Sequence, residues 1–456
     1  MARKPHVLAI PFPAQGHVAP FMKLALQIAA NGVKITFVNS ESVHERIMAS
    51  VSADIEEQSL ISLVSIPDAL ESRGAQRNAV NFTKRAQKGM PGSLKNLIEK
   101  INQSNINEQI TCVLADTTAV WALEVAKEMG IGRIAVQVAG PAVLALSLQI
   151  PQLLGAGILD NDGILVKGES ISLSKEIPAW SRSDIPWSSS DPEMQKAIFG
   201  LSCTLPKIVG FTNLILSNTF YELDASALKL VPNILPIGPL HARNYMGTFA
   251  GNFWPEDSIC ISWLDQQTAG SVIYVAFGST GKFSPQQVDE LALGLELTGH
   301  PFLWVVRSNL SNGSVTKFPE GFIERIADRG KIVEWGPQEK VLAHPSVACF
   351  VSHCGWNSTL EGLSKGIPFL CWPYFTDQLH NKSYICDVWR IGLGVDPDEN
   401  GIITRHEIST KIKAVLSSDA IKANALHLKE LARKSVNEGG SSYKNFKSFI
   451  EQIKGV

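Results

Sequence analysis

The sequence lacks the short motifs that identify several large classes of enzyme. It contains no G-x-G-x-x-G after an apolar strand and no G-x-x-x-x-G-K-[ST], so it shows neither a dinucleotide-binding fingerprint nor a P-loop. It also contains no C-x-x-C pair and no H-E-x-x-H. These absences argue against a zinc enzyme and a nicotinamide-dependent oxidoreductase. We therefore expect no metal site.

The chain also lacks an excess of charge and a regular arrangement of cysteines. Its 41 Lys and Arg residues nearly balance its 43 Asp and Glu residues, which leaves a net charge of −2. A protein that binds nucleic acid through a broad surface needs clustered positive charge, so we expect no nucleic-acid partner. The seven cysteines are an odd number without a repeated short spacing, which favours reduced thiols in a cytoplasmic protein over a disulfide framework.

No apolar run is long enough to suggest a membrane span. The longest apolar region, 131–158, is interrupted by Gly140 and Pro151, whereas a spanning helix needs about 20 nearly unbroken apolar residues. We interpret this region as a buried strand followed by a core helix. Near the start of the chain, Pro11 and Pro13 interrupt a short apolar run, so we expect no signal peptide.

What the sequence does contain is a regular alternation of apolar strand-like runs and helical patterns. Its 456 residues are enough for two or three domains. The predicted strands are 6–12, 33–38, 110–115, 133–138, 271–277, 302–307, 332–335, 348–351 and 369–372, and the clearest helices are 18–30, 119–129 and 285–298. This alternation predicts two doubly wound α/β domains that face each other across a cleft. The aperiodic stretch 236–257 separates them, with the boundary near Gly238-Pro-Leu240.

In open α/β sheets, ligands bind beyond the carboxyl ends of the strands. The segment 351–361 begins at such an end and continues into a helix, where Gly355 allows a tight turn. The first amides of a helix suit a phosphate or diphosphate, and His353, Asn357 and Ser358 add side-chain donors. For Asn357 or Ser358 alone, an ordinary N-cap is the competing interpretation.

Polar and aromatic residues follow the neighbouring strands. Trp335 comes directly after a strand and could stack on a base, although a Trp is more often part of a core. Glu361 lies about one turn into the helix, where its carboxylate could accept two ribose hydroxyls or simply face solvent. The pair Asp377 and Gln378 suits sugar hydroxyls, but alone it would be an ordinary helix start.

In the first half, His17 and Asp116 are the candidates for proton chemistry. His17 follows the first strand at the beginning of a helix, and Asp116 ends another strand of the same predicted sheet. An Asp that accepts from one ring nitrogen would fix the tautomer, and the other nitrogen could then take a proton from a substrate hydroxyl. A structural role for a single His near the chain start is the alternative.

The stretch from Trp335 to Gln378 resembles the 44-residue signature box of plant family 1 UDP-dependent glycosyltransferases. It reads WGPQEKVLAHPSVACFVSHCGWNSTLEGLSKGIPFLCWPYFTDQ. The resemblance extends over the whole chain through PFPAQGH, LAD, IGPL, WLDQQ and VIYVAFGS, and the overall pattern is similar to the UGT83-type branch. Gly362, where many members have Ser, and Ile367, where Val is usual, depart from the pattern.

The resemblance implies a GT-B fold with two Rossmann-like domains and a division of labour between them. Residues 1–240 would bind the acceptor, and residues 241–435, with the linker 238–257, would bind the nucleotide sugar. The last helices, about 436–456, would pack back on the first domain. Residues Asn78 to Met90 and Gly140 to Gly157 would line the acceptor pocket, and their Phe82, Leu144 and Leu148 suggest an apolar molecule.

The resemblance also implies roles for individual residues. His17 would be the general base and Asp116 its supporting acid. Trp335 would stack on uracil, Gln338 would lie beside the uridine and Glu361 would bind the ribose. The diphosphate would be held by Ser279, His353, Asn357 and Ser358, with Trp356 in the same turn, and the sugar hydroxyls by Asp377 and Gln378.

From these features we expect an inverting, metal-independent enzyme that transfers glucose from UDP-glucose to a hydroxyl of a small apolar plant metabolite such as a phenolic, a flavonoid or a terpenoid. The donor follows from Gln378, because a terminal Gln in this box is associated with glucose. We expect a cytoplasmic monomer. Three alternatives stay open: a C-glycosyltransferase, a transferase of another UDP-sugar, and a catalytically silent module that binds a UDP-sugar.

Overall fold

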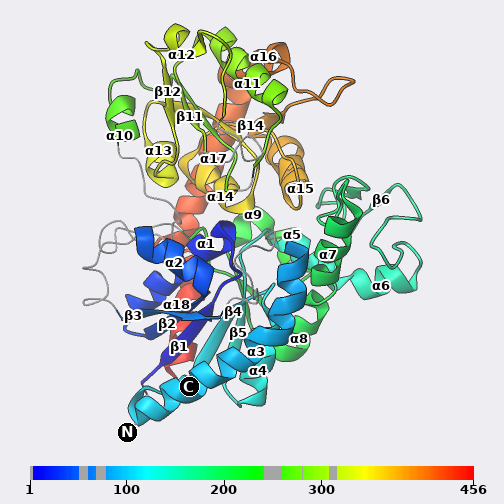
Figure 1. Cartoon of the computed structure of the whole chain (residues 1–456), viewed down its shortest axis with the longest axis vertical. Helices are drawn as coiled ribbons and strands as arrows, with labels where there is room; N and C mark the ends of the chain where they lie inside the picture. Colours follow the sequence, from blue (N-terminus) through cyan, green and yellow to red (C-terminus); the bar gives the residue numbers. More distant parts are fainter. Residues whose placement is uncertain are drawn as a thin grey trace. The chain divides into compact units, whose positions relative to one another are not determined.

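The computed structural model describes residues 4–50, 60–67, 79–240, 259–279, 281–307 and 316–455, without the side chains of residues 50 and 79–88. These residues form two compact units (Figure 1). The first contains the described residues up to 240 together with Lys434 and those after it, and the second contains 259–433. Most of the predicted linker, 241–257, lies outside the described residues.

The first unit is built on a seven-stranded parallel sheet in the order β3-β2-β1-β4-β5-β8-β9. Its strands are β1 His6–Ile10, β2 Lys34–Ser40, β3 Ile61–Ile66, β4 Cys112–Asp116, β5 Gly132–Gln137, β8 Ile215–Ser217 and β9 Ile234–Pro236. Strands β1 and β4 are buried along their whole length, since helices cover both faces, and this explains their continuous apolar sequences. A separate two-stranded sheet pairs β6 Ser170–Ile171 with β7 Trp180–Ser181.

Two apolar cores stabilise the first unit. One unites α1 with the sheet and with the C-terminal helix α18, whose Phe449 and Ile450 are buried in it. The other unites the sheet with α3, α4 and α5. The helices are α1 Gln15–Ala29, α2 Glu41–Ser50, α3 Ala79–Ser104, α4 Val120–Glu128, α5 Pro141–Leu148, α6 Ile150–Gly155, α7 Pro192–Ser202, α8 Ile208–Phe211, α9 Tyr221–Leu228 and α18 Ser441–Lys454.

The prediction of a single core helix after the strand in 131–158 is wrong, because the structure has two helices there. Helix α5 ends at Leu148, and α6 starts at Ile150 with Pro151 in its first turn. A proline has no N–H to donate and fits best in the first turn of a helix, so Pro151 begins a new helix.

The second unit repeats the plan with six parallel strands in the order β12-β11-β10-β13-β14-β15. Its strands are β10 Val272–Ala276, β11 Phe302–Val305, β12 Gly330–Val333, β13 Val347–Ser352, β14 Phe369–Cys371 and β15 Gly392–Gly394. Its helices are α10 Ile259–Leu264, α11 Pro285–Thr298, α12 Phe322–Arg325, α13 Gln338–Ala343, α14 Trp356–Lys365, α15 Gln378–Ser383, α16 Arg405–Ser417 and all but the last three residues of α17 Asp419–Val436. The prediction of two doubly wound α/β domains is confirmed.

Both sheets reverse their strand order at one point, between β1 and β4 in the first unit and between β10 and β13 in the second. At such a point the chain leaves two adjacent strands in opposite directions, which opens a crevice at their carboxyl ends. His17 and Asp116 follow β1 and end β4, and Ser279 and His353 follow β10 and β13. These four candidate residues therefore lie at the two switch points.

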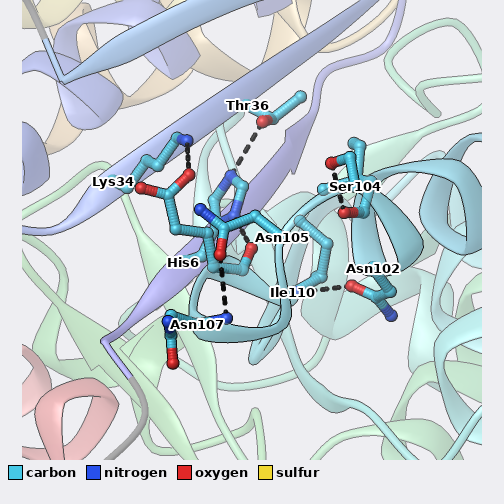
Figure 2. A network of polar contacts seen from close by, with 10 residues as sticks. His6, Lys34, Thr36, Asn102, Ser104, Asn105, Asn107 and Ile110 are labelled. Atoms are coloured by element: carbon cyan, nitrogen blue, oxygen red, sulfur yellow. Dashed lines mark hydrogen bonds and ion pairs between the residues drawn. The ribbon is translucent and has the colours of Figure 1, made fainter.

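The opposite, amino-terminal edge of the first sheet is closed by a polar network around His6 (Figure 2). The His6 ring lies within hydrogen-bond distance of Thr36 Oγ1 (2.8 Å) and of the Glu108 carbonyl (2.7 Å), and Lys34 pairs with the Glu108 carboxylate at 2.5 Å. Burial lowers the pKa of His6 and favours a neutral imidazole. This network connects β1 and β2 to the loop before β4, and we assign it to the stability of the fold.

Candidate active site

The switch point of the first unit brings His17 and Asp116 together. His17 Nδ1 donates to Asp116 Oδ2 at 2.8 Å, and the His17 side chain is 27% exposed whereas that of Asp116 is fully buried. The ring of Phe12 lies beside the imidazole, with a centroid distance of 5.1 Å. With the proton on Nδ1, the lone pair of the imidazole is on Nε2. A partly exposed imidazole is thus oriented by a carboxylate that solvent cannot reach.

Asp116 is held in its ionised form. Burial alone would raise its pKa, but the facing His17 and hydrogen bonds from Thr118 outweigh burial, so the pKa of Asp116 is lowered. Thr118 donates to Asp116 Oδ1 through its amide at 2.9 Å and its hydroxyl at 2.6 Å. The carboxylate therefore stays charged at neutral pH and can stabilise an imidazolium opposite it.

A buried polar chain continues from this pair toward α5. Thr117 donates to Gln137 Oε1 at 2.7 Å, and Gln137 Nε2 donates to the carbonyl of Gly140, which precedes the first residue of α5. This links the ends of β4 and β5 to the start of the helix predicted to border the acceptor. Of the apolar residues predicted for that pocket, Leu144 is completely buried in the core and Leu148 packs against the same core. The side chain of Phe82 lies outside the described residues.

In the second unit, Gln338, Ser358 and Glu361 form one hydrogen-bonded cluster. Gln338 Nε2 donates to Glu361 Oε2 at 2.7 Å and to Ser358 Oγ at 2.9 Å. The buried Tyr274 hydroxyl, on β10, donates to Gln338 Oε1 at 3.3 Å. Tyr274 was missed by the sequence analysis, although a Tyr inside a buried strand usually needs a hydrogen-bond partner.

His353 is enclosed by the two turns of the second switch point. A Cβ on Gly278 would lie 2.6 Å from His353 Nε2, and one on Gly355 would lie 2.5 Å from it, so only glycine fits at these positions with the ring where it is. Burial lowers the pKa of His353 to about 4, and the positive charge of Arg307 acts in the same direction. His353 is thus neutral at neutral pH, and any contribution to an anion comes through a neutral N–H.

Helix α14 starts at Trp356, three residues after His353. Gly355 precedes the helix and offers no side-chain cap, so the first amides are not capped from that residue. Asn357 is half-buried in the first turn. The Trp356 indole is buried and packs near Trp389 at a centroid distance of 6.3 Å. The backbone amide of Trp356, rather than its buried ring, is therefore suited to bind an anion.

Asp377 and Gln378 stand at the start of α15 and are tied to the adjoining loop. The amide of Tyr374 donates to Gln378 Oε1 at 3.1 Å, and Asn381 Nδ2 donates to Asp377 Oδ2 at 2.9 Å. Asn381 also donates to the carbonyl of Cys354, which connects this helix to the turn before α14. Because the loop uses the Gln378 oxygen, its NH2 group is the part suited to a sugar hydroxyl.

The remaining predicted residues lie at the same edge of the second sheet. Trp335 lies two residues after β12 and is half-buried, and Ser279 follows β10 by three residues. The Ser279 carbonyl accepts a hydrogen bond from Arg307, a buried residue after β11 that the sequence analysis did not select. A charged residue at the end of a buried strand is the signal that could have revealed it.

Among the described residues, no three His, Cys, Asp or Glu side chains are grouped so that they could hold a metal ion. No helix in the described ranges combines the length and apolar character needed to cross a bilayer.

Comparison with family models gives two matches. Residues 187–436 match the family described as UDP-glucoronosyl and UDP-glucosyl transferase. Residues 4–66 match the model described as glycosyltransferase, N-terminal domain. Together these matches include His17 and the whole segment from Trp335 to Gln378.

Individual proteins are similar over nearly the full chain. UDP-glycosyltransferase 83A1 of Arabidopsis thaliana is 41% identical, over 99% of this chain and 97% of its own. The structure of Os79 from O. sativa in complex with UDP superposes with a TM-score of 0.82 at 26% identity, over 98% of this chain and 100% of that one. Phytolacca americana UGT2 complexed with UDP-2fluoro-glucose and pterostilbene gives a TM-score of 0.82 at 25% identity, over 98% and 99%. The predicted GT-B fold and the resemblance to the UGT83-type branch are confirmed.

Proposed function

Because the chain belongs to the UDP-glucoronosyl and UDP-glucosyl transferase family, and is therefore a UDP-glycosyltransferase, we propose that it transfers glucose from UDP-glucose to a hydroxyl of a small apolar plant metabolite with inversion at the anomeric carbon. The observation that carries this proposal is the hydrogen bond between His17 and the buried, ionised Asp116. A silent module that only binds a UDP-sugar needs no such pair.

In the proposed mechanism, His17 is the general base. Its Nε2 takes the proton of the acceptor hydroxyl while the oxygen forms a bond to the anomeric carbon of UDP-α-glucose. The bond from that carbon to the diphosphate oxygen breaks, UDP leaves, and the product is a β-glucoside. Asp116 stabilises the imidazolium that forms, because its pKa keeps it ionised.

The second unit supplies the donor site in this proposal. Trp335 stacks on uracil, and Glu361, oriented by Gln338, accepts the ribose hydroxyls. The first amides of α14 with Asn357, Ser358, Ser279 and the neutral His353 receive the negative charge that grows on the diphosphate. Asp377 and the NH2 group of Gln378 bind the glucose hydroxyls.

The donor and acceptor classes have separate support. Gln378 at the end of the signature box favours glucose, and the structure of a similar protein is complexed with UDP-2fluoro-glucose and pterostilbene, a phenol. These points favour UDP-glucose with a phenolic acceptor. We further propose that the enzyme works as a monomer in the cytoplasm, which light scattering of the purified chain and localisation of a tagged copy can test.

The decisive experiment incubates the purified chain with UDP-glucose, UDP-galactose, UDP-xylose or UDP-glucuronate and a panel of phenols, flavonoids and terpenoid alcohols. Mass spectrometry should find hexosides, fastest with UDP-glucose, and acid should release the sugar because the linkage is through oxygen. An acid-resistant product would identify a C-glycosyltransferase, and a faster second donor would revise the choice of glucose. No transfer with any pair, despite UDP binding, would favour the silent module.

A further inference from the structure

Arg307, which follows β11, is connected to the turn after β10. Its guanidinium donates to the carbonyl of Ser279 through one terminal nitrogen at 2.5 Å and to the carbonyl of Gly281 through the other at 2.7 Å. The residue is 6% exposed. A planar fork that binds two carbonyls of one turn fixes their relative orientation, which a flexible ammonium group does not do.

The same turn is held at two further points. The Tyr374 hydroxyl donates to the carbonyl of Phe277 at 3.3 Å. A Cβ on Gly281 would lie 2.7 Å from the Phe277 carbonyl oxygen, so the turn is too tight for a larger residue. In a trans peptide the C=O and N–H point in opposite directions. A Phe277 carbonyl directed at the Tyr374 hydroxyl therefore directs the Gly278 amide away from that hydroxyl.

Arg307 also brings a positive charge to this place. A guanidinium stays charged at neutral pH even though burial lowers the pKa of Arg307. Its charge is felt at His353, where it opposes protonation of the imidazole. Since charges interact more strongly inside a protein than in water, the guanidinium favours an anion on the other side of the turn.

We infer that Arg307 is a positioning residue for the diphosphate of the donor: it holds the carbonyls of Ser279 and Gly281 after β10 and supplies a fixed positive charge beside them. The inference rests on the proposed binding of a UDP-sugar at this switch point. It assigns Arg307 no direct contact with the ligand, so its effect must depend on whether the ligand carries phosphates.

The test compares UDP with uridine as ligands of the full-length chain, using direct calorimetry for UDP and displacement titration for uridine. We expect Arg307→Met to weaken UDP binding about tenfold to a hundredfold, the range for hydrogen bonds with a charged partner, and to change uridine binding less than about threefold. Arg307→Lys keeps the positive charge but loses the planar fork, so its UDP affinity should lie between those of the wild type and Arg307→Met. Arg325→Met, an exposed arginine paired with Glu296, is the matched control and should change neither affinity.

The outcomes are distinguishable. If Arg307→Met and Arg307→Lys weaken UDP and uridine equally, or weaken neither, the inference is wrong while the proposed function stands. If the wild type binds no UDP, the proposed function is wrong and the inference with it. Should the Met variant fail to fold, as judged by circular dichroism, the Lys variant gives the same comparison between the two ligands.

Discussion

The two switch points of this molecule have the same topology and different chemistry. In both sheets the order reverses beside the first strand of the unit, β1 or β10. At the first, a side-chain hydrogen bond of 2.8 Å joins an accessible imidazole to a buried carboxylate. At the second, two glycine turns enclose a neutral imidazole, and a buried guanidinium holds one of these turns. The first suits proton transfer and the second suits an anion.

This difference shows that the fold determines where a binding crevice forms, whereas a few residues determine the chemistry that the crevice supports. The strand order opens a crevice at the carboxyl edge in each unit, irrespective of what binds there. A base needs a partner that fixes its tautomer, which Asp116 provides. An anion needs amides and a nearby positive charge, and residues with side chains at Gly278 or Gly355 would displace His353 from its position.

The largest effect should come from removing His17, the proposed base at the first switch point. We expect His17→Ala to lower kcat toward a phenol about 10²- to 10⁴-fold, the usual contribution of general-base catalysis. UDP affinity, measured by calorimetry, should stay within about twofold of wild type because that residue belongs to the other unit. An unchanged kcat would remove His17 from the mechanism and the contrast between the two sites with it.

Removing the charge of its partner should have a smaller effect. Asp116→Asn keeps the shape of the side chain but no longer stabilises an imidazolium, so we expect kcat to fall about tenfold to a hundredfold, in the range of a charged hydrogen bond. Stopped assays at several pH values provide the measurement. If the Asn variant turned over at the wild-type rate, Asp116 would serve folding alone.

At the second switch point, an added methyl group should disturb the proposed donor site without affecting His17. Gly355→Ala places a Cβ 2.5 Å from His353 Nε2, and overpacking of about 1–3 kcal/mol corresponds to a fivefold to hundredfold loss of UDP affinity. Combining it with His353→Ala removes the collision and should recover part of any loss of thermal stability. Gly200→Ala in α7, where a Cβ meets open space, is the control. Unaltered UDP affinity in Gly355→Ala would show that this turn does not touch the nucleotide.

The smallest effect concerns pH and His353. Its folded-state pKa of about 4 lies below the ordinary value of about 6.5, so the unfolded chain binds the proton first as pH falls. Stability is therefore complete above about pH 6.5 and is lost as pH falls toward 4. Between pH 6.5 and 5.5 the loss is about 1 kcal/mol. The thermal unfolding midpoints of the wild type and His353→Gln should approach each other as pH is lowered from 8 to 5.5. A difference between the two midpoints that stays constant over this range would contradict a neutral imidazole.

Much of the fold could be predicted from the sequence, because strands buried on both faces have continuous apolar runs and helices have their own period. The helix predicted at 285–298 agrees with α11, and Asp116 ends a strand as expected. The pairing of His17 with Asp116 followed from the rule that parallel strands end at one edge. The break between α5 and α6 was missed, since an apolar run alone does not show where a helix ends.

Other features depend on contacts between residues far apart in the chain. Leu144 was expected beside an acceptor but is buried in the core, because an apolar side chain looks the same in sequence whether it faces a ligand or a neighbour. The departure at Gly362 also has a tertiary reason: a Cβ there would collide with the ring of Phe369. Neither could be read from spacing.

By itself, the sequence determined the class of fold, the two places where chemistry could occur and the family of the enzyme, since these depend on local periodicity and on residues adjacent in the chain. Only the tertiary structure decided that Tyr274 orients Gln338, that His353 is buried and neutral, and that Arg307 bonds the turn after β10. Burial and hydrogen-bond geometry arise when distant segments pack together, and they set the charge and direction of each group.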